Sequence, residues 1–378
     1  MANLKRNNDM AVSPVVATLV LIVVAVIGAV AVGTIMGTFS SDVSKKASAG
    51  QAGDAAASEI LIAGSTTCIP AELNLANDYS RQNPGFQINV QGGGSAQGPQ
   101  SVALGIADIG ATSSASAITT AMNNNANDPI YQNLYFTQIG GRGVVFIQDS
   151  TKAAVPTNVV SAGDLLAAYT DANLNKGKTT TANGNVTGPG SVGNVTMVQR
   201  EAGSGTMSTA FSWIGGAAKT AKDTGFANLS TQSSNAAMLT AVKAGTATAP
   251  AVGFVDSGYA ISGGLTSTTT APGISIMNVV DSTAPTAGYA ASHANIKAAL
   301  KDWYYANAQG TNYPQGLVGG LYWVTKGSSP SSFNGNVVVE GKSTAGSAVT
   351  GLISFAKSPV EAAAFNNVGM YSMYDFIN

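Results

Sequence analysis

The segment Arg200-Glu201-Ala202-Gly203-Ser204-Gly205-Thr206-Met207-Ser208-Thr209-Ala210-Phe211 combines glycines, hydroxyl side chains and an arginine at the start of a helix. Its glycines allow a tight turn and a close approach of the backbone to a ligand, because they carry no Cβ. Ser204 and Thr206 add hydroxyl donors and favour the N-cap of the helix that begins near Met207. The first N–H groups of a helix attract anions, and Arg200 supplies a cation for charge-assisted hydrogen bonds. The segment therefore predicts an oxyanion site; an ordinary capped turn with a surface arginine is the alternative.

The composition excludes several classes of function. At 378 residues the chain is longer than one core usually supports, which predicts two globular units or two lobes. The net charge is −1 and only 10% of the residues are charged, so the sequence offers no basic surface for nucleic acid. The single cysteine, Cys68, and the single histidine, His293, exclude an intramolecular disulfide and a thiolate or histidine metal cluster. We therefore expect no metal, no cofactor, no catalytic residues and no nucleic-acid partner.

An apolar segment near the N-terminus has the length of a membrane span. No charged residue occurs from Met10 to Ser41, and residues 15–37 would extend roughly 35 Å as a helix at ~1.5 Å per residue. Lys5 and Arg6 precede this segment and Asp42 follows it, so the positive-inside rule places the N-terminus in the cytoplasm. A secretory signal peptide is the alternative, but its apolar region is shorter and ends at a small-residue cleavage site. We expect a single-pass protein of the cell membrane whose remaining chain is extracytoplasmic.

The beginning of this apolar segment resembles a known family. Asp9-Met10-Ala11-Val12-Ser13-Pro14-Val15-Val16 is similar to the N-terminus of archaeal type IV pilins and archaellins, in which a short leader precedes a long apolar helix. The resemblance covers residues 1–40 and implies cleavage by a prepilin-type peptidase near Met10 and Ala11. No basic residue stands directly before that position, so removal of the leader stays open. The small residues of the helix, among them Gly28, Gly33 and Gly37, favour packing with other pilin-like helices, and a monomeric anchor is the alternative.

After a small, polar spacer at residues 41–58, three further segments repeat the pattern of the Arg200 segment. Each contains a short predicted strand and a loop rich in Gly, Ser or Thr, and the first two loops lead into predicted helices. They are Ile60-Leu61-Ile62-Ala63 with Gly64-Ser65-Thr66-Thr67 and a helix from Ile69-Pro70; Phe86-Gln87-Ile88-Asn89-Val90 with Gly92-Gly93-Gly94-Ser95; and Ala107-Asp108-Ile109-Gly110-Ala111-Thr112-Ser113-Ser114. Several loops of this kind arise by chance far less often than one, so together they strengthen the predicted oxyanion site.

The order and approximate spacing of these motifs resemble the phosphate-binding proteins of high-affinity phosphate ABC importers. The motifs are Gly64-Ser65-Thr66-Thr67, Gln91-Gly92-Gly93-Gly94-Ser95, Ala107-Asp108-Ile109-Gly110, the Arg200 segment, Ala251-Val252-Gly253-Phe254-Val255, Gly320-Leu321-Tyr322-Trp323-Val324-Thr325-Lys326-Gly327 and Ile353-Ser354-Phe355-Ala356-Lys357-Ser358-Pro359-Val360-Glu361-Ala362. The resemblance implies the α/β type II periplasmic-binding-protein fold, in which two lobes joined by two crossing strands hold a ligand between them. We expect this domain at residues 59–378, with lobe one at 59–147 and 290–378 and lobe two at 148–289.

The resemblance also implies which residues contact the anion. They are Thr66, the backbone at Thr67, Ser95, Ser113, Arg200, Ser204, Gly205 and Thr206. The chain has Ser113 where the family often has an aspartate that accepts the proton of hydrogen phosphate, which leaves selectivity against sulfate open. It also has Ala202 in place of an acidic residue, and the neighbouring Glu201 is a candidate substitute. Arg142 is expected to be a solvated hinge residue, and a second cation in the cleft is the alternative.

The resemblance predicts a membrane-anchored, extracytoplasmic solute-binding protein that captures inorganic phosphate and presents it to an ABC permease. One alternative is a pilin-like surface filament subunit whose head retains the binding fold. Another is a protein that binds a different tetrahedral oxyanion, such as sulfate. An enzyme such as a phosphatase is disfavoured, because no metal ligands and no paired acid and base are evident in the sequence.

Overall fold

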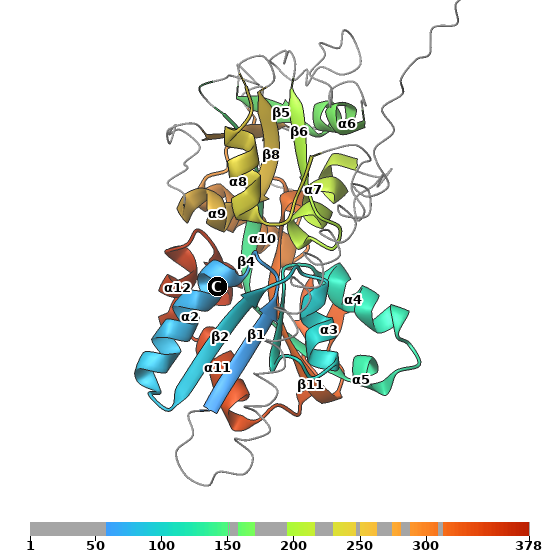
Figure 1. Cartoon of the computed structure of the whole chain (residues 1–378), viewed down its shortest axis with the longest axis vertical. Coiled ribbons are helices and arrows are strands. Elements are labelled where there is room, and N and C mark those ends of the chain that lie inside the picture. Colours follow the sequence, from blue (N-terminus) through green and yellow to red (C-terminus); the bar gives the residue numbers. More distant parts are fainter. Residues whose placement is uncertain are drawn as a thin grey trace, which may run out of the picture. The chain divides into compact units, whose positions relative to one another are not determined.

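The computed structural model describes residues 58–149, 151, 158–170, 195–215, 230–246, 250–262, 274–280, 288–308 and 313–377 (Figure 1). The chain divides into two units, Met1–Ala56 and Ala57–Asn378, and every described residue belongs to the second unit. The predicted leader and apolar helix, and the spacer up to residue 57, lie outside the described residues. Within the described ranges, no helix has both the length and the apolar character needed to cross a bilayer.

A mixed β-sheet forms the centre of the described unit. In spatial order its main strands are β2 (Phe86–Gly92), β1 (Ser58–Gly64), β3 (Ile109–Thr112), β11 (Val318–Ser329), β4 (Leu134–Gln148), β8 (Ala251–Asp256), β6 (Thr196–Arg200) and β7 (Ser230–Gln232). β14 (Lys342–Ser343) pairs with β11, and β15 (Tyr371–Ser372) and β9 (Ser275–Ile276) pair with β4. β1 is parallel to β2 and β3, and β6 is parallel to β7 and β8, whereas β4 is antiparallel to β11 and β8. Two separate strand pairs are β5 (Val159–Ser161) with β10 (Asn278–Val280) and β12 (Ser332–Asn334) with β13 (Val337–Val339).

Strand β4 runs through two halves of this sheet. Its residues from Leu134 to Gly143 pair with β11, and those from Val144 to Gln148 pair with β8. We call β2, β1, β3 and β11 the first half-sheet, and β8, β6 and β7 the second half-sheet. Every residue of β4 is buried, including Arg142, which lies directly before the change of partner.

Helices follow the parallel strands and cover the sheet (Figure 1). They are α2 (Ile69–Gln82), α3 (Gln97–Ala103), α4 (Ala115–Asn124), α5 (Pro129–Gln132), α6 (Ala162–Thr170), α7 (Gly205–Gly215), α8 (Asn235–Lys243), α9 (Ser257–Ser262), α10 (His293–Tyr304), α11 (Ser347–Ala356), α12 (Ala362–Asn366), α13 (Met373–Ile377) and the short 3₁₀ turns η3 (Gln315–Leu317) and η4 (Pro359–Glu361). The successions β1–α2, β2–α3, β3–α4 and β6–α7 confirm the predicted strands and loops. Gly64 shows why glycine ends β1: its φ is +144°, and a Cβ there would lie 2.1 Å from the Ala111 carbonyl oxygen.

Apolar side chains pack on both half-sheets. On the second half-sheet, the rings of Phe146, Tyr169, Phe211 and Phe254 meet edge to face within one buried cluster. A second cluster joins β1 to α2 and α11 in the first half-sheet and includes Ile60, Ile62, Leu75, Trp323 and Leu352. Fully burying one such side chain stabilises a fold by ~1.5–3 kcal/mol, so these clusters fix the strand ends from which the loops emerge.

One polar pair is buried in the core of the first half-sheet. Trp323 Nε1 on β11 donates a hydrogen bond of 2.7 Å to Glu72 Oε1 on α2, and Glu72 is only 1% exposed. Burial raises the pKa of Glu72 to about 8, and the hydrogen bond from Trp323 opposes this shift. The Glu72 carboxyl is therefore mostly protonated in the folded protein at neutral pH.

Candidate functional site

Three serine hydroxyls meet at the carboxyl ends of the first half-sheet strands. Ser65 follows β1, Ser95 follows β2 and Ser113 follows β3. Ser65 Oγ lies 3.1 Å from Ser113 Oγ and 3.0 Å from Ser95 Oγ, and the Ser95 and Ser113 hydroxyls are 3.0 Å apart. All three residues are buried, and we call them the serine triangle. Ser95 and Ser113 were predicted, whereas Ser65 was missed although it belongs to the predicted loop.

The start of α7 closes against the serine triangle. A Cβ on Gly205 would lie 2.4 Å from Ser113 Oγ and 2.6 Å from Ser95 Oγ, so this close approach requires glycine. Thr206 Oγ1 on α7 and Thr67 Oγ1 in the loop after β1 share a hydrogen bond of 2.9 Å. Ser204 caps α7, since its Oγ accepts a hydrogen bond of 3.3 Å from Met207 N–H.

Arg200 ends β6 beside these loops with a side chain that is only 1% exposed. Its Nε and Nη2 donate hydrogen bonds of 2.7 Å each to the two carboxylate oxygens of Glu201. Nη2 also donates to Thr66 Oγ1 at 3.2 Å, whereas Nη1 has no partner among the described residues. Glu201 therefore supplies the acidic partner that Ala202 cannot. All eight predicted residues lie in the loops that meet here, and their contacts with an anion remain predictions.

The expectation that Arg142 is solvated is wrong, because its side chain is 0% exposed. Arg142 Nη2 donates to the backbone oxygens of Ser113 at 2.7 Å and Gly205 at 3.1 Å, and to Thr209 Oγ1 at 2.8 Å. Its Nε lies 3.6 Å from Asp256 Oδ2. Burial lowers the pKa of Arg142, and the Asp256 carboxylate opposes this shift. Arg142 is thus a second buried cation, linked to loops of both half-sheets.

Sequence reasoning also missed residues on the helices α8 and α9, next to the second half-sheet, that hold the loop after β1. Asn235 Nδ2 donates to Thr67 Oγ1 at 3.2 Å, and Asn235 Oδ1 accepts from Asp256 N–H at 3.2 Å. The Tyr259 hydroxyl donates to the Thr66 carbonyl at 2.8 Å. Asp256 directly follows the motif Ala251-Val252-Gly253-Phe254-Val255, which marked the strand but not the acid at its end.

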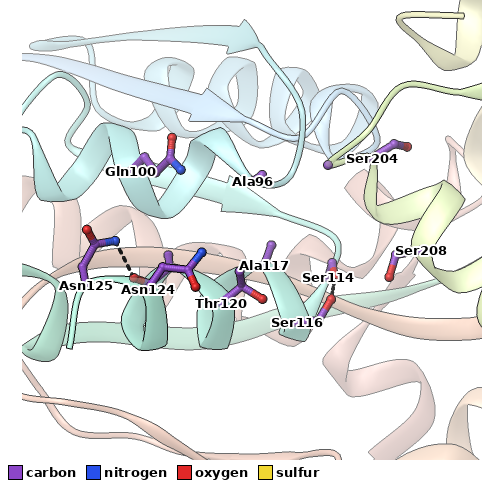
Figure 2. Close-up of a pocket in the computed structure, with 12 residues that line it drawn as sticks. Ala96, Gln100, Ser114, Ser116, Ala117, Thr120, Asn124, Asn125, Ser204 and Ser208 are labelled. Atoms are coloured by element: carbon purple, nitrogen blue, oxygen red, sulfur yellow. Dashed lines mark hydrogen bonds between the residues drawn. The ribbon is translucent and has the colours of Figure 1, made fainter. Parts of the chain in front are cut away.

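A side cavity of about 170 Å³ lies next to these loops. Figure 2 shows Gln100 on α3, Thr120 and Asn124 on α4, and Ser204 and Ser208 where α7 begins. None of the described residues that line the cavity carries a charge. The cavity shares Ser204 with the anion loop and provides uncharged hydroxyl and amide groups, whereas the buried residues Arg142, Arg200 and Asp256 are not part of its lining.

The site is suited to a small anion. Hydroxyls from several loops and the guanidinium groups of Arg142 and Arg200 are buried together, which excludes water and strengthens charge-assisted hydrogen bonds. In the described part of the chain, no three His, Cys, Asp or Glu side chains are placed to hold a metal ion. Cys68 is buried beside the loop after β1, and burial raises the pKa of its thiol well above the ordinary value.

Comparisons with known proteins agree with the fold. No curated protein matches the chain. Among solved structures, a Clostridium perfringens protein assigned to the phosphate ABC transporter substrate-binding proteins, with bound phosphate, has a TM-score of 0.54 and 16% identity, covering 83% of this chain and 99% of that chain. An ABC-type phosphate transport receptor from Vibrio cholerae has a TM-score of 0.50 and 20% identity, covering 82% of this chain and 99% of that chain. A family model described as a PBP superfamily domain matches residues 49–356. Since that match covers most of the sequence, the chain belongs to the PBP superfamily.

Proposed function

We propose that this chain is an extracytoplasmic solute-binding protein that captures inorganic phosphate and presents it to an ABC permease. The observation that carries the proposal is the meeting of four loops, in which the serine triangle faces Gly205 beside the buried Arg200. Hydroxyl donors, helix N-termini and a buried guanidinium together stabilise a tetrahedral oxyanion. The two similar structures, a substrate-binding protein with bound phosphate and a phosphate transport receptor, support this ligand and support binding rather than catalysis.

The proposal includes a membrane anchor. Residues 15–37 have the length and composition of a membrane-spanning helix, and Lys5 and Arg6 place its N-terminal end in the cytoplasm. An anchor of this kind would keep the binding domain close to a permease in the same membrane. The pilin-like packing of this helix and the removal of its leader are further parts of the proposal, and the two similar structures do not support them.

Calorimetric titration of the full-length chain in detergent tests the ligand. Inorganic phosphate should bind with a stoichiometry of about one, and free phosphate at 100 times its dissociation constant should stabilise the folded protein by roughly 2.7 kcal/mol. Sodium chloride at matched ionic strength is the control, because it screens charges without offering a tetrahedral oxyanion. If neither heat nor a rise in melting temperature accompanies millimolar phosphate, the proposal fails.

A further inference from the structure

The side cavity adjoins the predicted anion loops through residues that are their direct neighbours in the chain. Four of its lining residues are Ala96 after Ser95, Ser114 after Ser113, and Gly203 and Ser204 before Gly205. The Ala96 N–H donates a hydrogen bond of 3.3 Å to the Gly203 carbonyl, so the loops before α3 and α7 meet at the cavity wall. An anion held by these loops would therefore have the side cavity beside it.

The side cavity, like the anion loops, is formed by segments that follow strands of both half-sheets. α3 and α4 follow β2 and β3 of the first half-sheet, and α7 follows β6 of the second. Figure 2 shows Gln100 on α3 across the cavity from Thr120 and Asn124 on α4, with Ser204 and Ser208 toward α7. A group in the cavity would contact the same helices whose first residues surround the predicted anion position.

The lining offers hydrogen-bonding groups that are not already used. The side chains of Gln100, Thr120 and Asn124 have no hydrogen-bond partner among the described residues, so their donors and acceptors are available to a ligand. Ser114 at the N-cap of α4 makes no side-chain cap bond, and N–H groups in the first turn of a helix have no partner within the helix. Hydroxyl groups, which both donate and accept, suit such a lining.

The charge and the size of the cavity narrow the class of group that fits it. None of its described lining residues carries a charge, so a charged substituent would lose water there without gaining a partner of opposite charge. Ala96, Ala117 and Ala121 offer methyl groups to the C–H groups of a ligand. The volume of about 170 Å³ corresponds to roughly six waters at ~30 Å³ each, which is the size of a three-carbon polyol. A small polyol therefore matches the cavity in charge, polarity and volume.

On the basis of the proposed function, we propose that the site also binds phosphomonoesters of a small polyol. The phosphate group lies at the anion loops, and the polyol lies in the side cavity, where its hydroxyls bond to Gln100, Thr120 and Asn124. The second pKa of a phosphomonoester is about 6, so at pH 8 the ester brings a dianionic phosphate group to the anion loops. The side cavity then decides which esters bind, because it accepts a neutral substituent and rejects a charged one.

The first test titrates the full-length chain in detergent at pH 8 with inorganic phosphate, glycerol 3-phosphate and 3-phosphoglycerate, followed by calorimetry. The dissociation constant of glycerol 3-phosphate should lie within about tenfold of that of inorganic phosphate, because each new neutral hydrogen bond contributes about fivefold and offsets the loss of one free phosphate oxygen. 3-Phosphoglycerate has a carboxylate in place of the terminal hydroxymethyl group. It should bind at least about tenfold more weakly than glycerol 3-phosphate, because the cavity provides no cation.

The second test changes the cavity without changing the anion loops. Ala117→Phe places a ring in the cavity and should weaken glycerol 3-phosphate by about tenfold or more, while inorganic phosphate, which leaves the cavity empty, keeps its affinity. Asn123→Phe is the matched control, because Asn123 is an exposed residue of the same helix that does not line the cavity. Thr120→Val removes one hydroxyl from an exposed position at nearly constant size and should weaken the ester alone by about fivefold.

The outcomes separate this inference from the proposed function. If the wild type binds inorganic phosphate but not glycerol 3-phosphate, or binds both esters equally well, the inference is overturned and the proposed function stands. If Ala117→Phe and Thr120→Val leave the ratio of the ester to the phosphate dissociation constant unchanged, the polyol does not occupy the cavity and the inference is also overturned. Should Ala117→Phe not fold, the same ratio in Thr120→Val decides. If the wild type binds none of these ligands, both fail together.

Discussion

Replacing Gly205 with alanine tests whether the loops of the two half-sheets act as one binding site. The new Cβ would lie 2.4 Å from Ser113 Oγ and 2.6 Å from Ser95 Oγ, whereas ordinary contacts of a Cβ begin at 3.4 Å. Gly205 does not have a positive φ, so alanine is compatible with the backbone at this position. The substitution therefore acts on the approach of α7 to the serine triangle. To reach an ordinary contact distance, the new Cβ and the serine hydroxyls would have to move about 1 Å apart.

The size of the effect follows from this overlap. Overpacking a well-packed contact costs ~1–3 kcal/mol, which corresponds to a loss of phosphate affinity of about 5- to 150-fold. The stability without ligand should change little, since each half-sheet has its own apolar contacts and alanine is a better helix former than glycine. Binding should therefore weaken while the melting temperature of the ligand-free protein is maintained.

The assay is calorimetric titration with phosphate, combined with thermal melts in the absence and presence of the anion. Gly85→Ala is the matched control, because a Cβ at Gly85 meets nothing within 4 Å. If Gly205→Ala binds phosphate as tightly as Gly85→Ala, the contact between α7 and the serine triangle is not part of the binding-competent structure. The reasoning about the site would then be refuted.

Three further predictions concern Arg200, Glu72 and the N-terminal segment. Arg200→Ala should weaken phosphate and sulfate alike in a titration, by ~2–5 kcal/mol, because it removes a buried cation and leaves Glu201 unpaired; a loss for one anion alone would contradict this. The pKa of Glu72 in the folded protein, about 8, lies above its ordinary value of 4.5, so the stability from its protonated form is present below pH 4.5 and is lost as the pH rises toward 8. Melts should show Glu72→Gln gaining stability relative to the wild type from pH 5 to pH 8, and a constant difference would argue against a buried neutral carboxyl. Protease added to intact cells should digest the domain after residue 58; resistance until lysis would reverse the orientation assigned from Lys5, Arg6 and Asp42.

The sequence predicts the loops of the site because their signals are local. A glycine that ends a strand and a Ser or Thr that begins a helix can be recognised from a few neighbouring residues. The loops that they form lie together because the carboxyl ends of parallel strands meet at one edge of the sheet. Local signals do not show which of several adjacent hydroxyl side chains is buried. The chain turns at residues 66–68 after β1, and in this turn Ser65 and Thr67 are buried while Thr66 is less so. Composition alone does not reveal which of these side chains is buried, and Ser65 was missed for this reason.

Arg142 and Asp256 show what long-range pairing adds. Arg142 stands among glycines, a pattern that favours a mobile and solvated hinge, yet β4 passes between β11 and β8 and is buried throughout. Its environment therefore depends on pairing with strands more than 100 residues away in sequence, as the register of Val144 with Asp256 and of Arg142 with Gly319 shows. Asp256 looks like an ordinary acid at a strand end in the sequence, and only the folded chain shows that its Oδ2 lies 3.6 Å from Arg142 Nε. Residue types at motif positions predicted which loops meet, whereas the partners of Arg142 and Asp256 are defined only by the folded chain.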